Sequence, residues 1–296
     1  MATVVWGSDI GDAWLNAYEQ LLPRGEVHNL TVNIASPLEE DLGVRRVIER
    51  KLLDFETAGG KDHRNPQSMD TVASTIFPVA LYRPGPGAAE RLFRNVARAE
   101  SLRAHSRRKG WGTYIGRLTN YPSPAGARVN QLELAIDRLS ARDKAWSDLY
   151  ELPIGAPGEP YAPDSAGVSL GTHADMAYDA RTIGNPCLAH ISLTRLNGVV
   201  HMVALYRRHH YVARAYGNFL GLGRLLNFLA AESGLEPGEL TVVTGHALAE
   251  TSKRHAIYGE ARQAAREVVP IEVGARPLGA SVDDLELPRG GGGGGR

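Results

Sequence analysis

The sequence predicts a single domain of mixed α and β structure, because segments with the period of a strand alternate with segments with the period of a helix. Apolar residues occupy every second position of residues 187–194, which is typical of a strand. The dipeptide Asn197-Gly198 follows, and a two-residue hairpin turn prefers it because both turn positions need positive φ. From Asn218 onwards, leucines recur at the spacing of one helix face, and Gly234 stands where such a helix would end.

Further elements follow from the same two periods. The spacing of apolar residues predicts helices over residues 8–22, 44–53, 88–105, 130–139 and 260–267, and strands over residues 27–34, 199–208 and 268–273. Polar, Pro- and Gly-rich composition predicts loops at residues 57–68 and 155–171. We expect one folded domain over residues 1–285 and a flexible tail over residues 286–296, because consecutive glycines cannot order without help.

Composition narrows the possible function classes. The chain of 296 residues is 43% apolar and 22% charged, as expected of a globular protein that can bury a core. Its formal net charge of zero argues against a nucleic-acid polymer or an anionic membrane as partner. The sequence shows no secretory signal and no run of roughly 20 apolar residues, so we expect a cytoplasmic protein.

Two patterns bear on metal binding. Cys187 is the only cysteine, which excludes an internal disulfide and a thiolate metal cluster. His209 and His210 are neighbours in a predicted strand. Adjacent side chains of a strand point to opposite faces, so these two imidazoles cannot easily share an ion. We therefore expect no metal.

Four short motifs in residues 185–247 point to one family. They are Asn185-Pro186-Cys187, Leu205-Tyr206-Arg207-Arg208, an asparagine at the start of a long helix (Asn218), and Leu235-Glu236-Pro237-Gly238. In these motifs the chain resembles the thymidylate synthases and the related pyrimidine nucleotide hydroxymethylases, of which it would be a divergent member. The resemblance implies a thymidylate-synthase-like α/β (α+β) fold, in which a large mixed β-sheet is packed by helices and one sheet face serves for dimerisation.

The resemblance also implies roles for individual residues. Cys187 falls on the family's nucleophile, Arg208 on the arginine that binds the nucleotide phosphate, and Asn218 on the residue that pairs with the pyrimidine edge. Tyr114 matches a tyrosine that reaches the active site. Without the resemblance, the ordinary interpretations are a small buried thiol, a surface charge, a helix N-cap and a half-buried structural tyrosine, respectively.

Other positions depart from the family pattern. His209 takes the place of a phosphate-binding serine and His246 that of an aspartate beside the sugar site, so both are candidate substrate contacts. Leu248 and Glu250 stand where the family has the histidine and tyrosine that bind the sugar hydroxyl. The family's proton-transferring glutamate has no counterpart, and Asp70 is the nearest carboxylate.

The candidate residues suit covalent chemistry on a pyrimidine. A thiolate that adds to C6 breaks the conjugation of the ring and makes C5 nucleophilic. A free cysteine has a pKa of about 8.5, and a guanidinium such as that of Arg208 would lower it if it lay close by. The amide of Asn218 offers a donor and an acceptor to O4 and N3–H of uracil, which favours uracil over cytosine.

We therefore expect a homodimeric enzyme that transfers a methyl or hydroxymethyl group to C5 of a pyrimidine nucleotide, with 5,10-methylenetetrahydrofolate as the donor that the resemblance implies. The departures from the family pattern favour a specialised enzyme over the housekeeping one. Two alternatives stay open. One is a nucleotide-binding or regulatory protein that keeps the fold without catalysis, and the other is folate-independent cysteine chemistry at C5.

Overall fold

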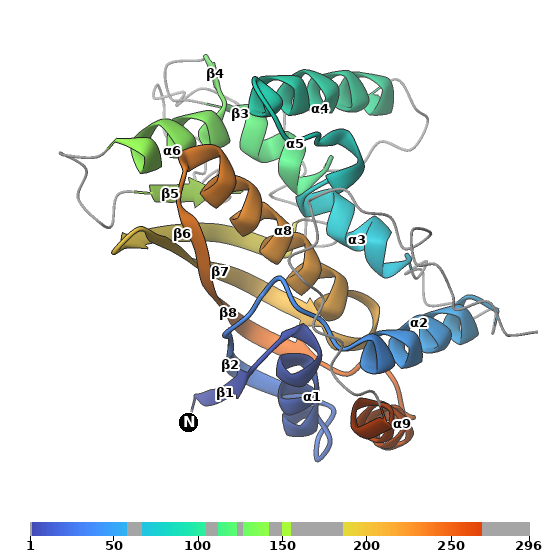
Figure 1. The fold of residues 1–296 in the computed structure, drawn as a ribbon. Helices are drawn as coiled ribbons and strands as arrows, with labels where there is room; N and C mark the ends of the chain where they lie inside the picture. The colour runs from blue at the N-terminus through green and yellow to red at the C-terminus, as the bar shows by residue number, and fades with distance from the viewer. Residues whose placement is uncertain are drawn as a thin grey trace, which may run out of the picture.

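The computed structural model describes residues 2–57, 67–104, 112–122, 127–141, 150–154 and 186–267. Its centre is a six-stranded sheet in the order β1-β2-β8-β7-β6-β5 (Figure 1). The pairs β1–β2 and β7–β8 are parallel and the other pairs are antiparallel, so the sheet is mixed, as expected. Its strands are β1 (Thr3–Gly7), β2 (Glu26–Ile34), β5 (Tyr150–Pro153), β6 (Leu188–Leu196), β7 (Val199–His210) and β8 (Glu236–Leu248).

The described helices leave one face of this sheet uncovered, and a short two-stranded ribbon accompanies them. The α-helices are α1 (Ile10–Leu21), α2 (Leu42–Thr57), α3 (Met69–Ile76), α4 (Ala88–Ala104), α5 (Tyr114–Thr119), α6 (Gln131–Ser140), α8 (Tyr216–Ser233) and α9 (Arg254–Glu267). A 3-10 turn, η1 (Val79–Leu81), follows α3, and a π-helical turn, η2 (Tyr211–Ala215), precedes α8. The ribbon pairs β3 (Tyr121–Pro122) with β4 (Arg128–Val129). Among the described helices none is long and apolar enough to cross a membrane.

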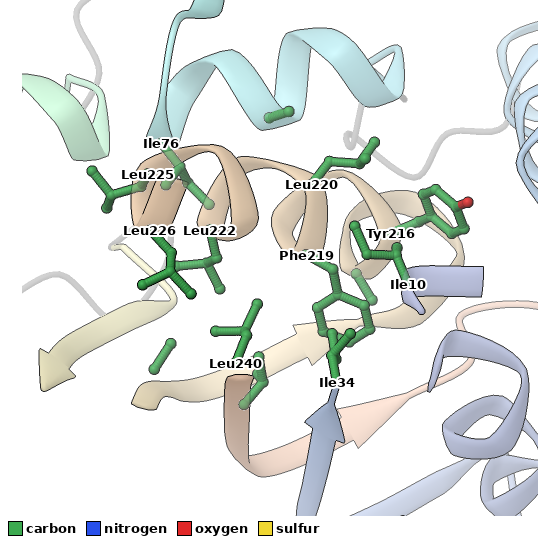
Figure 2. Close-up of a cluster of buried hydrophobic side chains, with 14 of the residues drawn as sticks. Ile10, Ile34, Ile76, Tyr216, Phe219, Leu220, Leu222, Leu225, Leu226 and Leu240 are labelled. Atoms are coloured by element: carbon green, nitrogen blue, oxygen red, sulfur yellow. The ribbon is translucent and has the colours of Figure 1, made fainter. Parts of the chain in front are cut away.

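The core lies between the sheet and the long helix α8. The leucines of α8 were predicted to share one face of the helix. Figure 2 shows Phe219, Leu222 and Leu226 directed towards the sheet, where Ile34 and Leu240 lie. All five side chains are fully buried. Burying a side chain of this size stabilises the fold by about 1.5–3 kcal/mol, so this contact holds the helix on the sheet.

The opposite side of α8 packs closely against its neighbours because it carries glycines. A Cβ added to Gly217 would lie 2.8 Å from the carbonyl oxygen of Met69 in α3, and one added to Gly221 would lie 2.8 Å from that of Ala73 in the same helix. Figure 1 shows α3 lying along α8 on the side away from the sheet. Helix α8 is therefore buried on both sides and forms the middle layer of the molecule.

No described helix covers the second face of the sheet. In β7 every second residue from 200 to 206 is buried, whereas Val203 and Leu205 between them remain 42% and 43% exposed. In β1 the side chains of Val4 and Trp6 are 56% and 65% exposed. A sheet face with this many exposed apolar side chains is unusual for a monomer.

A kink crosses β2, β8 and β7 at one level of the sheet. In β8, Thr244 and Ala247 are both buried although they are three positions apart, whereas a regular strand buries every second residue. The register with both neighbouring strands is unchanged on the two sides of this level. Asn29 of β2 has a φ of 55° here, and a Cβ on Gly245 of β8 would approach the carbonyl oxygen of Arg207 in β7 to 3.1 Å.

The kink changes which side chains face the helices. In β7, Tyr206 and His209 are both buried, so Arg208 lies on the uncovered face and is exposed. The next strand, β6, has a bulge directly after Leu188, one residue beyond Cys187. The predicted active-site segment therefore lies where four neighbouring strands depart from regular alternation.

Most elements predicted from the sequence are confirmed. The hairpin turn has positive φ at both Asn197 (50°) and Gly198 (82°), and Gly234 ends α8 with a φ of 66°. Helices α1, α2, α4, α6 and α9 and strand β2 correspond to predicted segments, although α9 begins before residue 260. Strands β1 and β5 were not predicted. The strand predicted for residues 268–273, the loop at 155–171 and the tail lie outside the described residues.

Candidate active site

Cys187 lies at the start of β6 and is partly exposed. The hydroxyl oxygen of Tyr114 accepts hydrogen bonds from the backbone N–H groups of Cys187 (3.2 Å) and Leu188 (3.3 Å). Tyr114 opens helix α5, whose N-cap Thr113 accepts from the N–H of Gly116. The tyrosine predicted from the family resemblance therefore contacts the predicted nucleophile, across more than seventy residues of sequence.

Opposing effects act on the thiol of Cys187. Burial raises its pKa, while the guanidinium groups of Arg214, Arg207 and Arg208 lower it, in this order of influence. Arg214 belongs to the π-helical turn η2 between β7 and α8. Its Nη1 donates to Oε1 of Gln67 at 2.6 Å. Burial is the larger effect, so the pKa of the thiol lies above its ordinary value; Arg208 opposes this rise, as expected, but Arg214 opposes it more.

Glu250 holds the turn that carries Arg214. Its carboxylate accepts hydrogen bonds from the backbone N–H groups of Ala213 (2.7 Å) and Val212 (3.4 Å). It also acts electrostatically on Arg214: burial lowers the pKa of this guanidinium, while Tyr114, Cys187 and Glu250 raise it. Glu250 stands where the family has a sugar-binding tyrosine, and in this chain it positions a cation beside the thiol instead.

Asn218 and His209 form a second buried group. The Nδ2 of Asn218 lies 2.9 Å from Nε2 of His209, and Oγ1 of Thr244 lies 3.4 Å from its Nδ1. Burial lowers the pKa of His209 to about 3, so its imidazole is neutral at physiological pH. The alternative interpretation of Asn218 as a helix N-cap is wrong, because α8 begins at Tyr216 and continues directly from the π-helical turn.

Tyr206 stands between the two groups. Its ring stacks on that of His209 at a centroid distance of 4.3 Å and an interplanar angle of 2°. Burial raises the pKa of its hydroxyl, and the neighbouring Tyr114 and Cys187 raise it further. This hydroxyl is fully buried and has no hydrogen-bond partner among the described residues. The thiol and the buried Asn218–His209 pair are thus linked through a single side chain.

Arg208 and His246 lie together on the uncovered face beyond the kink. They are paired in the register of β7 and β8. Nε2 of His246 lies 2.9 Å from Oε2 of Glu26, and its ring stacks on that of His28 at 4.7 Å. Arg208 acts electrostatically on two groups: its charge favours the thiolate of Cys187 and the carboxylate of Glu26. The prediction that His246 contacts a sugar stays a prediction.

Asp70 is engaged in ion pairs. Its carboxylate accepts from Arg45 at 2.6 Å and from Arg224 at 3.0 Å. Burial acts to raise the pKa of Asp70, but the two guanidinium groups outweigh it and the pKa is lowered. Asp70 is therefore a structural carboxylate that links α3 to α2 and α8, and it does not replace the family's proton-transferring glutamate.

The structure adds functional residues that the sequence did not single out. Arg214 lies in a segment that looks like an irregular loop in the sequence, where no period indicates which side chains turn inward. Glu26 and His28 lie on the uncovered face because of the kink at Asn29. A pattern of strict alternation does not predict this kink. Compared with known proteins, the chain matches no family model and no curated protein.

We predict that Arg214→Gln slows alkylation of Cys187 by iodoacetamide severalfold at pH 8, because loss of this cation raises the thiol pKa and only the thiolate reacts. The pH midpoint of alkylation should move upward. Intact mass measures the rate cleanly, since Cys187 is the only cysteine. Arg208→Gln is the matched control and should have a smaller effect. An Arg208→Gln effect equal to or larger than that of Arg214→Gln would contradict the assignment, provided that both variants keep the wild-type circular dichroism spectrum.

Proposed function

We propose that this protein transfers a methyl or hydroxymethyl group to C5 of a pyrimidine nucleotide through a covalent adduct between Cys187 and C6. The observation that carries the proposal is the convergence of Tyr114 and Arg214 on the start of β6. A cysteine that serves only as a small buried hydrophobe needs neither a fixed backbone nor adjacent cations. A nucleophilic cysteine needs both.

The nucleotide half of the reaction uses groups of this chain. The thiolate of Cys187 forms a bond to C6, and the electron pair of the C5–C6 double bond moves towards C5 and O4. C5 then bonds to the one-carbon electrophile and loses its proton. Completion of the transferred group would require release of the donor and addition of water for a hydroxymethyl group or of a hydride for a methyl group. The electron pair returns, the bond between sulfur and C6 breaks, and the thiolate is regenerated. Arg214 favours the thiolate at the start and at the end of this cycle.

Binding groups for the nucleotide lie on both sides of the thiol. The exposed guanidinium of Arg208 suits a phosphate, to which a planar fork can donate two hydrogen bonds. The amide of Asn218 suits the O4 and N3–H edge of uracil. His209 is too deeply buried to meet a phosphate, with 1% of its surface exposed. We assign it instead the role of holding the Asn218 amide in place through the contact of 2.9 Å.

The one-carbon donor is the one that the family resemblance implies. When bound, 5,10-methylenetetrahydrofolate would supply the electrophilic carbon. Two surface pockets of the described residues are lined by neither Cys187 nor Tyr114. The C-terminal segment, which closes over folate in the family that the sequence resembles, lies outside the described residues. We therefore keep folate as a prediction and derive no step from it.

The direct test is intact mass spectrometry after incubation with 5-fluoro-dUMP, 5-fluoro-UMP or 5-fluoro-CMP, each with and without methylenetetrahydrofolate. Fluorine at C5 cannot leave as a proton does, so the adduct on Cys187 should persist. We expect one nucleotide per chain for the matching base and sugar, and none for Cys187→Ser.

Each other outcome has a defined meaning. An adduct that forms equally well without folate would favour folate-independent cysteine chemistry at C5. Nucleotide binding without any adduct, and with Cys187→Ser binding as tightly as the wild type, would favour the non-catalytic binding protein. Absence of both binding and adduct would contradict the proposed substrate class.

We further propose that the uncovered sheet face joins two copies of the chain. Val203 and Leu205 lie on the central strand β7, and Val4 and Trp6 extend the apolar surface to the sheet edge. A two-fold interface would place each of these residues against the same face of the partner, so that one change acts twice.

We predict that Leu205→Glu weakens the dimer by about tenfold or more, because like charges across a two-fold interface repel and must be desolvated. Sedimentation velocity at several protein concentrations measures the effect. The matched control is Leu102→Glu on α4, where the leucine is 68% exposed and faces away from the sheet. A wild-type chain that sediments as a monomer at all concentrations would contradict the proposed dimer.

A further inference from the structure

Three potential metal ligands meet on the uncovered face beyond the kink, apart from the thiol. His28 of β2 stands directly opposite His246 of β8 in the strand register. Glu26 lies two residues from His28, and its carboxylate turns to the same histidine pair. Cross-strand neighbours and their diagonal neighbours are within reach of long side chains, so the register itself brings the three together.

The ligand atoms already lie close to one another. One nitrogen from each imidazole and one carboxylate oxygen are all within 4.8 Å of each other. Oε2 of Glu26 lies 2.9 Å from Nε2 of His246, and the two imidazole rings stack at 4.7 Å with an interplanar angle of 14°. The side chains of His246 and Glu26 are 28% and 54% exposed, so a hydrated cation can reach them.

We propose that Glu26, His28 and His246 form a binding site for a divalent transition-metal cation of the Zn²⁺ type. Two imidazole nitrogens and one carboxylate oxygen are ligands that such ions prefer, and water would complete a four-coordinate shell. Zn²⁺ takes nitrogen ligands at about 2.0–2.1 Å, so the side chains need only draw together slightly around it. This proposal departs from the sequence-based expectation of a protein without metal, which rested on the single cysteine and on the adjacent pair His209 and His210.

Charge supports a cation at this position. The carboxylate of Glu26, which contacts His246 at 2.9 Å, offsets part of the ion's charge. Two imidazoles stacked at this distance cannot both hold a proton without repulsion. A metal ion between the rings can use one lone pair from each of them at once. Arg208 carries an opposing charge near the site, because it also acts on Glu26.

The chain offers an internal comparison. His190 of β6 and Glu151 of β5 also form a His–carboxylate contact on exposed strand residues. The residue that joins them is Ser192, whose hydroxyl donates to Glu151, and among the described residues no third histidine, cysteine or carboxylate completes a ligand cluster with this pair. The same pair without a third ligand is thus an ordinary surface contact, and His190 is a suitable control.

The test is a titration of the full-length protein, first stripped with a chelator, with ZnCl2 in a calorimeter and with Co²⁺ followed by visible absorption. We expect one site per chain and four-coordinate Co²⁺ absorption bands. His28→Asn, His246→Asn and Glu26→Gln should each weaken binding by about tenfold or more, because each removes a direct ligand. His190→Asn should leave the affinity unchanged.

Two results would overturn the proposal. One is wild-type binding no tighter than that of the double variant His28→Asn/His246→Asn, and the other is loss of the site in His190→Asn. Thermal melting of each variant without metal shows whether the fold is intact. The readout does not involve Cys187, so failure of this proposal and failure of the proposed one-carbon transfer remain distinguishable.

Discussion

The alternation of side chains shifts by one position at one level of the sheet, in three neighbouring strands together. This level is marked by Asn29 of β2, Arg207 of β7 and Gly245 of β8. The shift occurs in all three strands together, so the hydrogen-bonded register is kept. A kink in one strand alone would break this register and leave backbone groups unpaired in the core. The placement of Arg208 and His209 depends on this shift, because without it Arg208 would face the helices and His209 would face outwards.

One side of the site is buried and the other is exposed to solvent. On the buried side, Asn218 of α8 and His209 of β7 carry no charge, which suits recognition of an uncharged base edge. On the solvent-exposed side, the guanidinium of Arg208 is accessible, which suits the binding of a phosphate. Cys187 lies at the boundary, where burial and three guanidinium groups oppose each other. Because burial outweighs the three guanidinium groups, the pKa of the thiol stays above its ordinary value, and the thiolate depends on these cations for its stabilisation.

The sequence was sufficient for the elements that have a local cause. Alternation and Asn197-Gly198 fixed the β6–β7 hairpin, and the leucine spacing with Gly234 fixed α8. The family resemblance led to Tyr114, whose contact with Cys187 no period could predict. Arg214 could not be found, because it lies in a π-helical turn, and neither could the cluster of Glu26, His28 and His246. That cluster depends on the register between β2 and β8, which are far apart in the sequence.

The central claim is that Cys187 adds to C6 of a pyrimidine nucleotide, and it can be tested without a one-carbon donor. Reversible addition in D2O exchanges the C5 proton of the nucleotide for deuterium, which proton NMR records as loss of the H5 doublet. The account predicts that the wild-type protein exchanges H5 of one pyrimidine nucleotide among dUMP, UMP and CMP, and that Cys187→Ser does not. Exchange at the same rate by Cys187→Ser, or no exchange of any nucleotide that the wild-type protein binds, would contradict it.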